Sequence, residues 1–498
     1  MMIAYEPREQ LPRLAWLARV SPGSIRVAHG PWVETQPQGF VAGAWDGDYS
    51  EFNFDQAPNL FGSGGRARDG RIVFATPTHQ IDRLYLMEID GICLVSNSPA
   101  FLLSEANDGP DHAHPNYFFD LVRHYRRGVS MGECSLPTDR GNSVKLFTCC
   151  NLTIDAQMRV AGEEKDPGPE PESYQQHRDL LGAVVRRVFL NASDARRKHA
   201  YQPIAAISRG YDSPAAAVLA AQAGCIRALS FSWSSSGSRI VDDHGGPIAE
   251  ALGMEVHTFD RSDFRDLPVD HQAEFFLSPA AHGDTGLGQA EELLEGSVLV
   301  TGRHGETAWG RALHGRAPKL RGTYNQILPG VESIEQRLRC GYIQLHPAYI
   351  GALHGPALHR VNKSPELDDW FLGTGYDRPL ARRIAEEGGV PRGLFGNVRA
   401  GGAGEQPRLS PEALAEFLKF YEANVPANIR RTLRETNTPR RLQVFKYLVR
   451  LRLRFAGRPF AERLLELLQV DRAHFLWKMR NLYIFHWGLI RTMERYRR

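Results

Sequence analysis

The chain has 498 residues, of which 42% are hydrophobic and 23% are charged, and its formal net charge is +3. This length suits two or three domains, each able to bury its own core, and the composition is typical of a soluble globular protein. The sequence opens on no basic and apolar signal segment and contains no apolar run of about 18 residues, so we expect a cytoplasmic protein without membrane contact.

Six cysteines are scattered along the chain without a CxxC pair or a regular spacing. A disulfide framework or a zinc site would show such a pattern, so both are disfavoured. We expect reduced, structural thiols at Cys93, Cys134, Cys149, Cys150, Cys225 and Cys340.

The first 160 residues contain short alternating apolar runs separated by glycine, aspartate and asparagine. This pattern predicts strands joined by hairpins, and hence a β-rich domain over residues 1–160. The glycine-rich run Gly62–Arg66 follows no apolar strand, so we expect a flexible loop there rather than a phosphate-binding one. The clearest predicted strands are Phe40–Ala44, Arg71–Ala75, Leu84–Met87 and Gly91–Val95.

Acidic residues and prolines are concentrated between Gly162 and Tyr174. This composition predicts a linker between two domains, over residues 161–175. Apolar residues then recur at helical spacing from Leu180 to Phe189 and predict a helix.

The stretch Ile204–Ala221 has the pattern of a buried strand, a polar turn with a glycine, and an alanine-rich helix. Pro214 suits the first turn of that helix, and Asp212 or Ser213 could cap it. Free backbone N–H groups and the positive end of the helix dipole would then face one point, an arrangement that binds phosphate. An ordinary strand-to-helix turn accounts for the same residues equally well.

Strands and helices continue to alternate after this stretch. Further strands are predicted at Arg227–Ser232, Met254–Phe259 and Val298–Val300, and a helix is predicted over Asp242–Gly253, ending at its glycine. The alternation predicts an α/β domain over residues 176–400 with a doubly wound parallel sheet and a ligand at the carboxyl ends of its strands.

Residues 401–498 combine helical periodicity with 20 lysines and arginines against nine acidic residues. A basic helical region of this kind can bind an anionic partner. A helix surface with its core on one face and solvent on the other is the simpler interpretation, so we do not expect a nucleic-acid partner.

Three motifs resemble those of the asparagine synthetase-like superfamily. Ser208–Ser213, SRGYDS, is similar to the pyrophosphate loop Ser-Gly-Gly-x-Asp-Ser of ATP pyrophosphatases, except that Arg209 replaces the second glycine. Thr301–Gly310, TGRHGETAWG, resembles the synthetase segment in which an aspartate binds metal, and Glu306 takes the position of that aspartate. Arg378–Pro391 resembles a late helix of the synthetases.

The first part of the chain carries a fourth, more diffuse likeness. The order of short strands and a helix after Asp82 is similar to that of the glutaminase-like half of asparagine synthetases. Glutamine-using members begin with a cysteine whose α-amine acts as the base, whereas Met1 and Met2 open this chain and its first cysteine is Cys93. The resemblance, which spans Phe40–Arg399, therefore implies a degenerate glutaminase-like domain of the Ntn type, followed by an ATP pyrophosphatase domain and a helical C-terminal region.

The resemblance also implies a reaction. A ligase of this kind uses ATP and Mg²⁺ to activate a carboxylate of a small molecule or peptide as its acyl-adenylate, releasing pyrophosphate. An amine then attacks to give an amide or a lactam and AMP, here without glutamine hydrolysis, as in β-lactam synthetases and lasso-peptide cyclases. The resemblance leaves the oligomeric state open, and a homodimer is one of the alternatives. A tRNA-modifying ATP pyrophosphatase and a nucleotide-binding relative without activity are the alternatives.

The matched motifs imply the site residues. Asp212 and Glu306 would hold Mg²⁺, and Arg399 would replace a phosphate-binding lysine of the family. Arg303 and His304 would contact substrate or pyrophosphate, although a surface histidine is an equally good interpretation of His304. The catalytic residues are thus expected to be Asp212, Arg303, Glu306 and Arg399. The expected ATP-binding residues are Ser208, Arg209, Gly210, Tyr211, Asp212, Ser213, Ser230 and Ser232.

Overall fold

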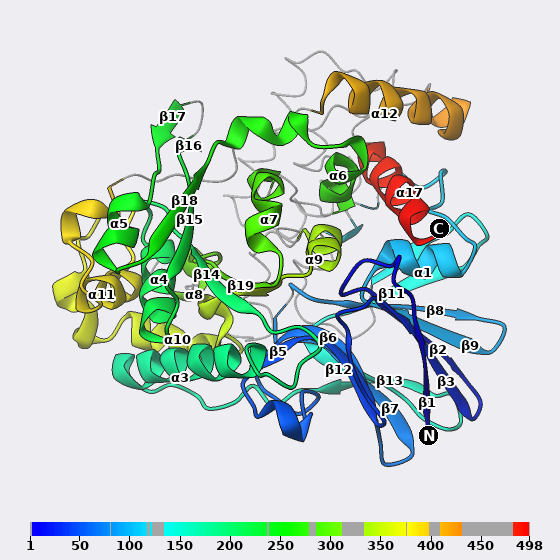
Figure 1. Cartoon of the computed structure of the whole chain (residues 1–498), viewed down its shortest axis with the longest axis horizontal. Helices are drawn as coiled ribbons and strands as arrows, with labels where there is room; N and C mark the ends of the chain where they lie inside the picture. The colour runs from blue at the N-terminus through cyan, green and yellow to red at the C-terminus, as the bar shows by residue number, and fades with distance from the viewer. Residues whose placement is uncertain are drawn as a thin grey trace, which may run out of the picture.

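The computed structural model describes residues 2–79, 81–115, 117, 120–121, 134–236, 239–277, 285–310, 333–374, 376–397, 409–430 and 482–497. The architecture is mixed α/β, with two β-sheets in the first part and a parallel sheet surrounded by helices after them (Figure 1). Residues 2–164 are called the two-sheet part below, and the rest of the described chain is called the α/β part.

The two-sheet part is built mainly from antiparallel strands. One sheet has seven strands in the order β1-β3-β2-β9-β8-β11-β10, and β1 pairs in parallel with β3 at its edge. The other sheet has six strands in the order β13-β12-β7-β6-β5-β4. The strands are β1 (Ile3–Pro7), β2 (Trp16–Ser21), β3 (Ser24–His29), β4 (Glu34–Gln36), β5 (Gly39–Trp45), β6 (Leu60–Arg68), β7 (Arg71–Ala75), β8 (Leu84–Ile89), β9 (Ile92–Ser96), β10 (Cys134–Pro137), β11 (Ser143–Phe147), β12 (Cys150–Ile154) and β13 (Val160–Glu164).

Aromatic side chains fill the space between these two sheets. Trp16 of β2 packs edge-on against Phe40 of β5, with 5.0 Å between ring centroids, and stacks on Phe74 of β7 at 6.0 Å. All three are buried, because alternation along each strand turns one apolar face inward. Helix α1 (Pro99–Glu105) packs against β8 and β9 of the seven-stranded sheet.

The four clearest strand predictions in this part are confirmed, apart from their end residues, as β5, β7, β8 and β9. The flexible loop expected at Gly62–Arg66 is wrong, since these residues lie within β6 and pair with β5 and β7. Glycine allows β5 and β6 to pack closely there, because a Cβ at Gly62 or Gly64 would overlap the backbone of β5.

The α/β part contains a five-stranded parallel sheet in the order β18-β15-β14-β19-β20. The chain builds outward from β14 to β18 and then returns to add β19 and β20 on the other side of β14. The crevice between the carboxyl ends of β14 and β19 is therefore a topological switch point, where open α/β sheets bind ligands. The strands are β14 (Gln202–Ala206), β15 (Arg227–Phe231), β18 (Glu255–Phe259), β19 (Ser297–Val300) and β20 (Ile343–Leu345).

Both faces of this sheet are covered. Ala205 and Ala228 belong to the large hydrophobic cluster that includes α4, whereas Ile204, Leu229 and Leu299 belong to a separate cluster with residues of α7. Alternate residues of a strand point to opposite faces, so each strand needs an apolar residue at nearly every position. The predicted parallel sheet with helices on both faces is confirmed. Strand β20 of this sheet was not predicted.

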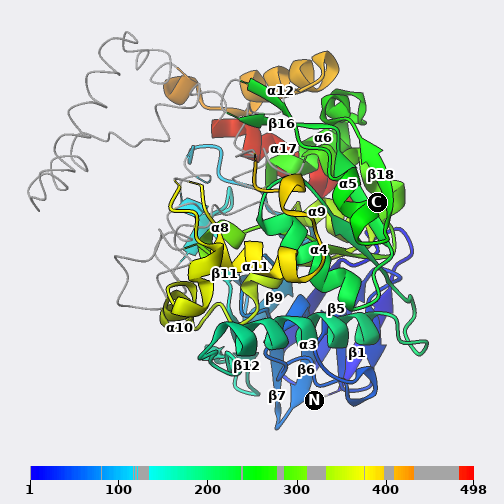
Figure 2. The ribbon, with the colours of Figure 1, turned by 90° about the vertical axis from the view of Figure 1, so that its left-hand side faces the viewer.

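Helix α3 (Tyr174–Ala192) packs against β5 of the two-sheet part and against α4, and Figure 2 shows it between the two parts. The hydroxyl of Ser173 caps it by accepting a hydrogen bond from the N–H of Gln176 at 3.2 Å. The buried side chains of α3 join one hydrophobic cluster with residues of both parts. The linker expected over residues 161–175 begins within β13 and ends in the first turn of α3.

The other helices surround the parallel sheet and the end of the chain. The helix expected over Asp242–Gly253 is shorter than predicted, because Asp242 ends the β16–β17 hairpin. Its C-terminal glycine is confirmed, with φ of 68° at Gly253. The elements are α4 (Asp212–Gln222), β16 (Trp233–Ser236), β17 (Arg239–Asp242), α5 (Gly246–Ala251), α6 (Val269–Glu274), α7 (Glu291–Leu294), α8 (Gly305–Ala308), α9 (Ile334–Cys340), α10 (Gly355–Asn362), α11 (Pro379–Glu387), α12 (Pro411–Asn424) and α17 (Ile484–Tyr496).

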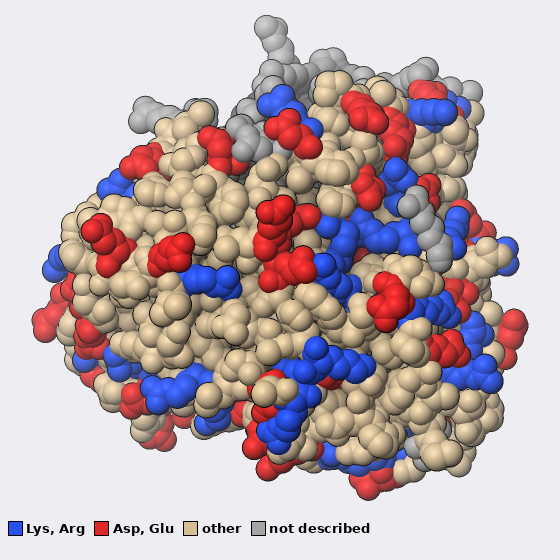
Figure 3. All heavy atoms as spheres, in the orientation of Figure 1, with Lys and Arg blue, Asp and Glu red and all other residues tan. Residues whose placement is uncertain are grey.

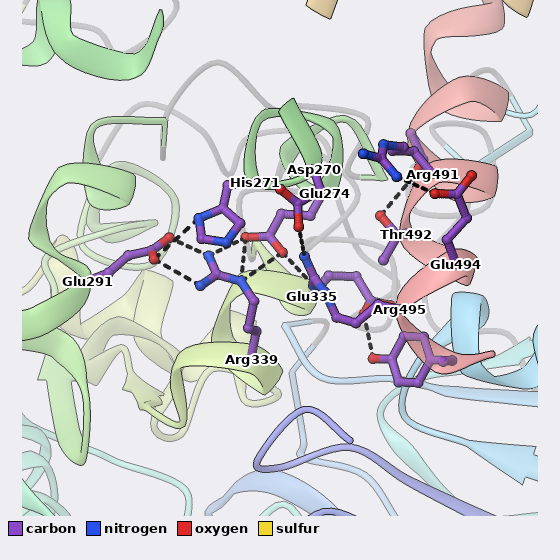
Figure 4. Close-up of polar contacts among 12 residues, drawn as sticks. Asp270, His271, Glu274, Glu291, Glu335, Arg339, Arg491, Thr492, Glu494 and Arg495 are labelled. Carbon is purple, nitrogen blue, oxygen red and sulfur yellow. Dashed lines mark hydrogen bonds and ion pairs between the residues drawn. The ribbon is translucent and has the colours of Figure 1, made fainter. Parts of the chain in front are cut away.

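A network of buried charged residues joins α17 to α6 and α9, and α9 in turn to the two-sheet part (Figure 4). The fully buried carboxylate of Glu274 on α6 accepts hydrogen bonds from Arg339 of α9 and Arg495 of α17, each at 2.7 Å. On α9, Glu335 accepts a hydrogen bond at 2.6 Å from Ser98, the residue that caps α1. Each of these acids has a partner, so we interpret the network as structural.

The helical structure predicted for residues 401–498 is confirmed in α12 and α17, whereas residues 431–481 lie outside the described residues. Among the helices that are described, none is both long and apolar enough to cross a membrane. Acidic and basic side chains are interspersed on the face of the molecule that Figure 3 shows.

Candidate functional site

The loop between β14 and α4 is closed by two serine hydroxyls. Oγ of Ser213 accepts a hydrogen bond from the backbone N–H of Ser208 at 3.0 Å, and the two hydroxyl oxygens lie 2.8 Å apart. The expectation that Asp212 or Ser213 caps α4 is wrong, because Tyr211 is the N-cap residue and no side chain bonds the helix end. The first N–H groups of α4 therefore stay free of side-chain caps.

Contacts of Tyr211 and of the Arg209 backbone stabilise the same loop. The buried ring of Tyr211 accepts a hydrogen bond at its hydroxyl from Arg382 of α11, at 2.6 Å, and packs against Tyr376. The N–H of Gly396 donates to the carbonyl of Arg209 at 2.8 Å. Only glycine suits that position, because its φ is 73° and a Cβ would overlap the Tyr211 ring. Tyr211 thus offers a ligand its backbone rather than its side chain.

A second loop, between β19 and α8, packs directly on the first. A Cβ at Gly302 would overlap the backbone of Asp212 and Ser213, and one at Gly305 would overlap the Asp212 carboxyl group. These two glycines allow the loops after β14 and β19 to meet at the switch point of the sheet. They place Glu306, which is exposed, near Asp212.

Asp212 is half-buried, and its carboxyl group has an incomplete set of partners. Its Oδ1 atom is buried and has no hydrogen-bond partner. Burial, together with the negative charge of Glu306, raises the pKa of Asp212 to about 7, although the guanidinium of Arg378 opposes the rise. A cation bound at Oδ1 would satisfy both the orphaned atom and the unfavourable charge.

Magnesium fits this pair of carboxylates only as part of a complex with phosphate. Within the described ranges, no group of three or more His, Cys, Asp or Glu side chains could hold a metal ion. Mg²⁺ commonly takes one or two carboxylates and completes its shell with water and substrate phosphates. Asp212 and Glu306 could supply the protein ligands, with the other positions left for a nucleotide.

Arg209 already has partners in the structure. Its Nη1 atom lies 2.7 Å from Oδ2 of Asp242, at the end of β17, and its backbone N–H donates to Oδ1 of Asp243 at 2.9 Å. The two aspartates were expected to start a helix, and sequence reasoning missed their role at the loop. An Asp-Asp pair after a strand-like run is a weak signal, since only the fold brings it to Arg209.

Ser230 and Ser232, which were expected to bind ATP, differ in their surroundings. The buried hydroxyl of Ser230 donates to the carbonyl of Ile207 at 3.0 Å and accepts from the N–H of Gly245 at 2.7 Å. It therefore connects the ends of β14 and β15 instead of facing a ligand. Oγ of Ser232 is buried without a partner.

The structure brings most of the predicted site residues together around the two loops. Arg303 is half-buried in the second loop. The interpretation of His304 as a surface histidine is wrong, because 6% of it is exposed and it adopts φ of 64°. Arg399 lies outside the described residues.

A scan of the sequence against protein-family models finds no match, and a search of curated proteins finds none either.

Proposed function

We propose that this protein is an ATP-dependent ligase that activates a carboxylate as its acyl-adenylate and passes the acyl group to an amine. The product would be an amide or a lactam, with AMP and pyrophosphate released and no glutamine consumed. The observation that carries the proposal is the uncapped start of α4 at the switch point, beside the orphaned carboxylate of Asp212. A polyphosphate supplies both the anion that such a helix end attracts and the ligands that a magnesium ion on Asp212 would need.

The proposed chemistry uses residues of both loops. The N–H groups at the start of α4 would bind phosphate oxygens, and Arg378 would add positive charge nearby. A carboxylate oxygen attacks the α-phosphorus, and the bond from that phosphorus to the β-phosphate oxygen breaks, with its electrons leaving on pyrophosphate. Magnesium held by Asp212 and Glu306 would supply charge neutralisation for the departing pyrophosphate. Holding the two reactants in line gives much of the acceleration in such a site.

The test is ATP–pyrophosphate exchange with the purified full chain. The panel comprises amino acids, dicarboxylic acids with their matched monocarboxylic acids, and short peptides that contain aspartate or glutamate. We expect exchange that depends on Mg²⁺ and on one class of carboxylate. Asp212→Asn and Glu306→Gln should abolish it, whereas Asp369→Asn, at an exposed position, should not. Absence of exchange with every carboxylate, or normal exchange in both site variants, would contradict the proposal.

A further inference from the structure

The hydroxyl of Tyr376 lies against the loop between β14 and α4. Tyr376 comes shortly before α11, and its ring packs on the ring of Tyr211 with 4.8 Å between centroids. The backbone N–H of Tyr211 donates to the Tyr376 hydroxyl oxygen, and Asp212 is close enough to act on the phenol electrostatically. A side chain from a distant segment of the chain thus reaches the start of α4.

The Tyr376 hydroxyl keeps a proton that it can donate. Burial and the negative charge of Asp212 both raise the pKa of Tyr376, so the phenol is protonated at neutral pH. A tyrosine hydroxyl both donates and accepts, and the N–H of Tyr211 uses only its accepting side. Within the described ranges, the hydroxyl donates to no other group. Because Tyr376 is half-buried rather than enclosed, a ligand from solvent can accept this proton.

Gly210 leaves a small space in front of this hydroxyl. A Cβ at Gly210 would lie 3.3 Å from the Tyr376 hydroxyl oxygen and 3.8 Å from Oγ of Ser208. Among the described residues beyond Arg209 and Tyr211, no other atom comes within 4 Å of that position. Gly210 does not adopt a positive φ, so the backbone conformation does not require glycine here. The space between the two hydroxyls is what the glycine provides, and it lets a ligand approach the backbone closely.

The surroundings of this space suit a phosphate group. The start of α4 has no side-chain cap. The guanidinium carbon of Arg378 lies 5.8 Å from the Tyr376 ring centroid, and its Nε is buried without a hydrogen-bond partner. These donors and the helix end favour an anion with several acceptor oxygens. The negative charge of Asp212 opposes an anion, and a phosphate that arrives with Mg²⁺ removes this conflict.

We propose that Tyr376 binds the pyrophosphate portion of ATP, with its hydroxyl donating to a phosphate oxygen that enters the space in front of Gly210. This inference rests on the proposed ligase function and adds to it a binding residue that lies outside the loops after β14 and β19. The short segment before α11 then contributes two phosphate-binding side chains, the hydroxyl of Tyr376 and the guanidinium of Arg378.

The experiment measures binding directly, by isothermal titration calorimetry of the full chain in Mg²⁺. The ligands are pyrophosphate and an ATP analogue with a methylene group between the α- and β-phosphates. Tyr376→Phe keeps the ring on Tyr211 and removes only the hydroxyl. We expect it to weaken binding of both ligands about 10- to 100-fold, as for loss of a hydrogen bond to a charged group. Tyr483→Phe, which removes a hydroxyl bonded to the carbonyl of His112, should match the wild type.

Gly210→Ala provides the second arm. Its methyl group fills the space in front of the Tyr376 hydroxyl without requiring a new backbone conformation, so binding of both ligands should fall by a similar factor. The double variant should bind about as weakly as the weaker single variant, because both changes remove the same contact. Gly182→Ala, on α3 at a position where a Cβ meets no atom within 4 Å, is the matched control.

The outcomes separate this inference from the ligase function. Wild-type affinity or tighter binding in Tyr376→Phe overturns the inference and leaves the ligase function standing. An equal rise in the carboxylate KM of the exchange assay overturns it too, because the hydroxyl would then only support the loop. Absence of both pyrophosphate binding and exchange in wild type overturns the ligase function and the inference with it. Circular dichroism spectra check the fold of each variant, and the two arms change different residues, so one arm suffices if a variant misfolds.

Discussion

Arg209 is paired with Asp242 across the mouth of the candidate site, at 2.7 Å between Nη1 and Oδ2. The adjacent Asp243 accepts the backbone N–H of Arg209, so the end of the β16–β17 hairpin holds both the side chain and the backbone of this residue. The ATP pyrophosphatase loop that Ser208–Ser213 resembles has glycine at this position, and here the arginine side chain is turned toward an acid. A polyphosphate would have to compete with Asp242 for the guanidinium.

We expect Arg209→Ala to weaken ATP binding about 10- to 100-fold, because a charge-assisted contact with phosphate would be lost. Folding stability should change by less than about 1 kcal/mol, since the pair with Asp242 is largely exposed. The KM for ATP in the exchange assay and urea unfolding measure the two effects. Arg159→Ala, at a distant exposed ion pair, is the matched control.

Two further variants test whether Arg209 binds phosphate or is merely compatible with the conformation of the loop. Asp242→Asn releases the guanidinium and removes a negative charge, so it should tighten ATP binding. Arg209→Gly introduces the glycine found in the ATP pyrophosphatase motif and removes the charge. If the glycine variant binds ATP as well as wild type, Arg209 has no role in phosphate binding.

Asp212→Asn should stabilise the ligand-free protein in a pH-dependent way. Because its pKa rises from 3.8 to about 7 on folding, the folded chain keeps a proton that the unfolded chain loses. Stability therefore falls as pH rises from about 4 to about 7. A pKa rise of this size lowers the free energy of unfolding of the wild type by at most ~4 kcal/mol at pH 8. Asp212→Asn should therefore be more stable than wild type by up to this amount at pH 8, and should show no such gain at pH 4.

Urea unfolding at several pH values tests this expectation, with Asp369→Asn as an exposed control. A constant difference between wild type and Asp212→Asn across pH 4–8 would contradict the assignment of a buried, partly protonated carboxyl group. Addition of Mg²⁺ and ATP should stabilise wild type and leave Asp212→Asn unchanged, because ligands stabilise only the form that binds them.

Glutamine should not serve as a nitrogen donor. The first cysteine of the chain, Cys93, is buried, and burial raises the pKa of its thiol to about 11, so the nucleophilic thiolate is scarce at neutral pH. Purified protein should release no glutamate from glutamine, with or without ATP. Glutamate release that disappears in Cys93→Ser would show that the two-sheet part retains glutaminase activity.

The contact between the two parts depends on a buried ion pair. Arg337 of α9 and Asp82 lie 2.8 Å apart, and Asp82 also accepts the N–H of Gly62 at 3.1 Å. Arg337→Met leaves a buried carboxylate without its cation and should destabilise the protein by about 3–5 kcal/mol. Addition of Asp82→Leu should restore much of that loss. Denaturant unfolding measures both, and Arg360→Ala, at an exposed pair, should cost less than about 1 kcal/mol.

The sequence by itself determined the local elements around the candidate site. The apolar run before Ser208 and the alanines after it specify a strand and a helix through short-range preferences, and the structure has β14 and α4 there. The glycine at Gly253 likewise ends α5 as predicted, because a left-handed C-terminal residue is a local requirement. Periodicity and turn chemistry act over a few residues, so they are visible without the fold.

Contacts between residues far apart in the sequence determine the remaining features of the fold and of the candidate site. Gly62–Arg66 lies in a strand because it pairs with β5 and β7, and its glycines allow β5 to approach closely, which no local pattern reveals. Strand order likewise depends on pairing across the sheet, and it alone sets Asp212 and the loop of Glu306 at one crevice. The burial of His304 and the pairing of Arg209 with Asp242 also depend on segments far apart in the chain. Burial and charge pairing are properties of surroundings, and only the tertiary structure provides those surroundings.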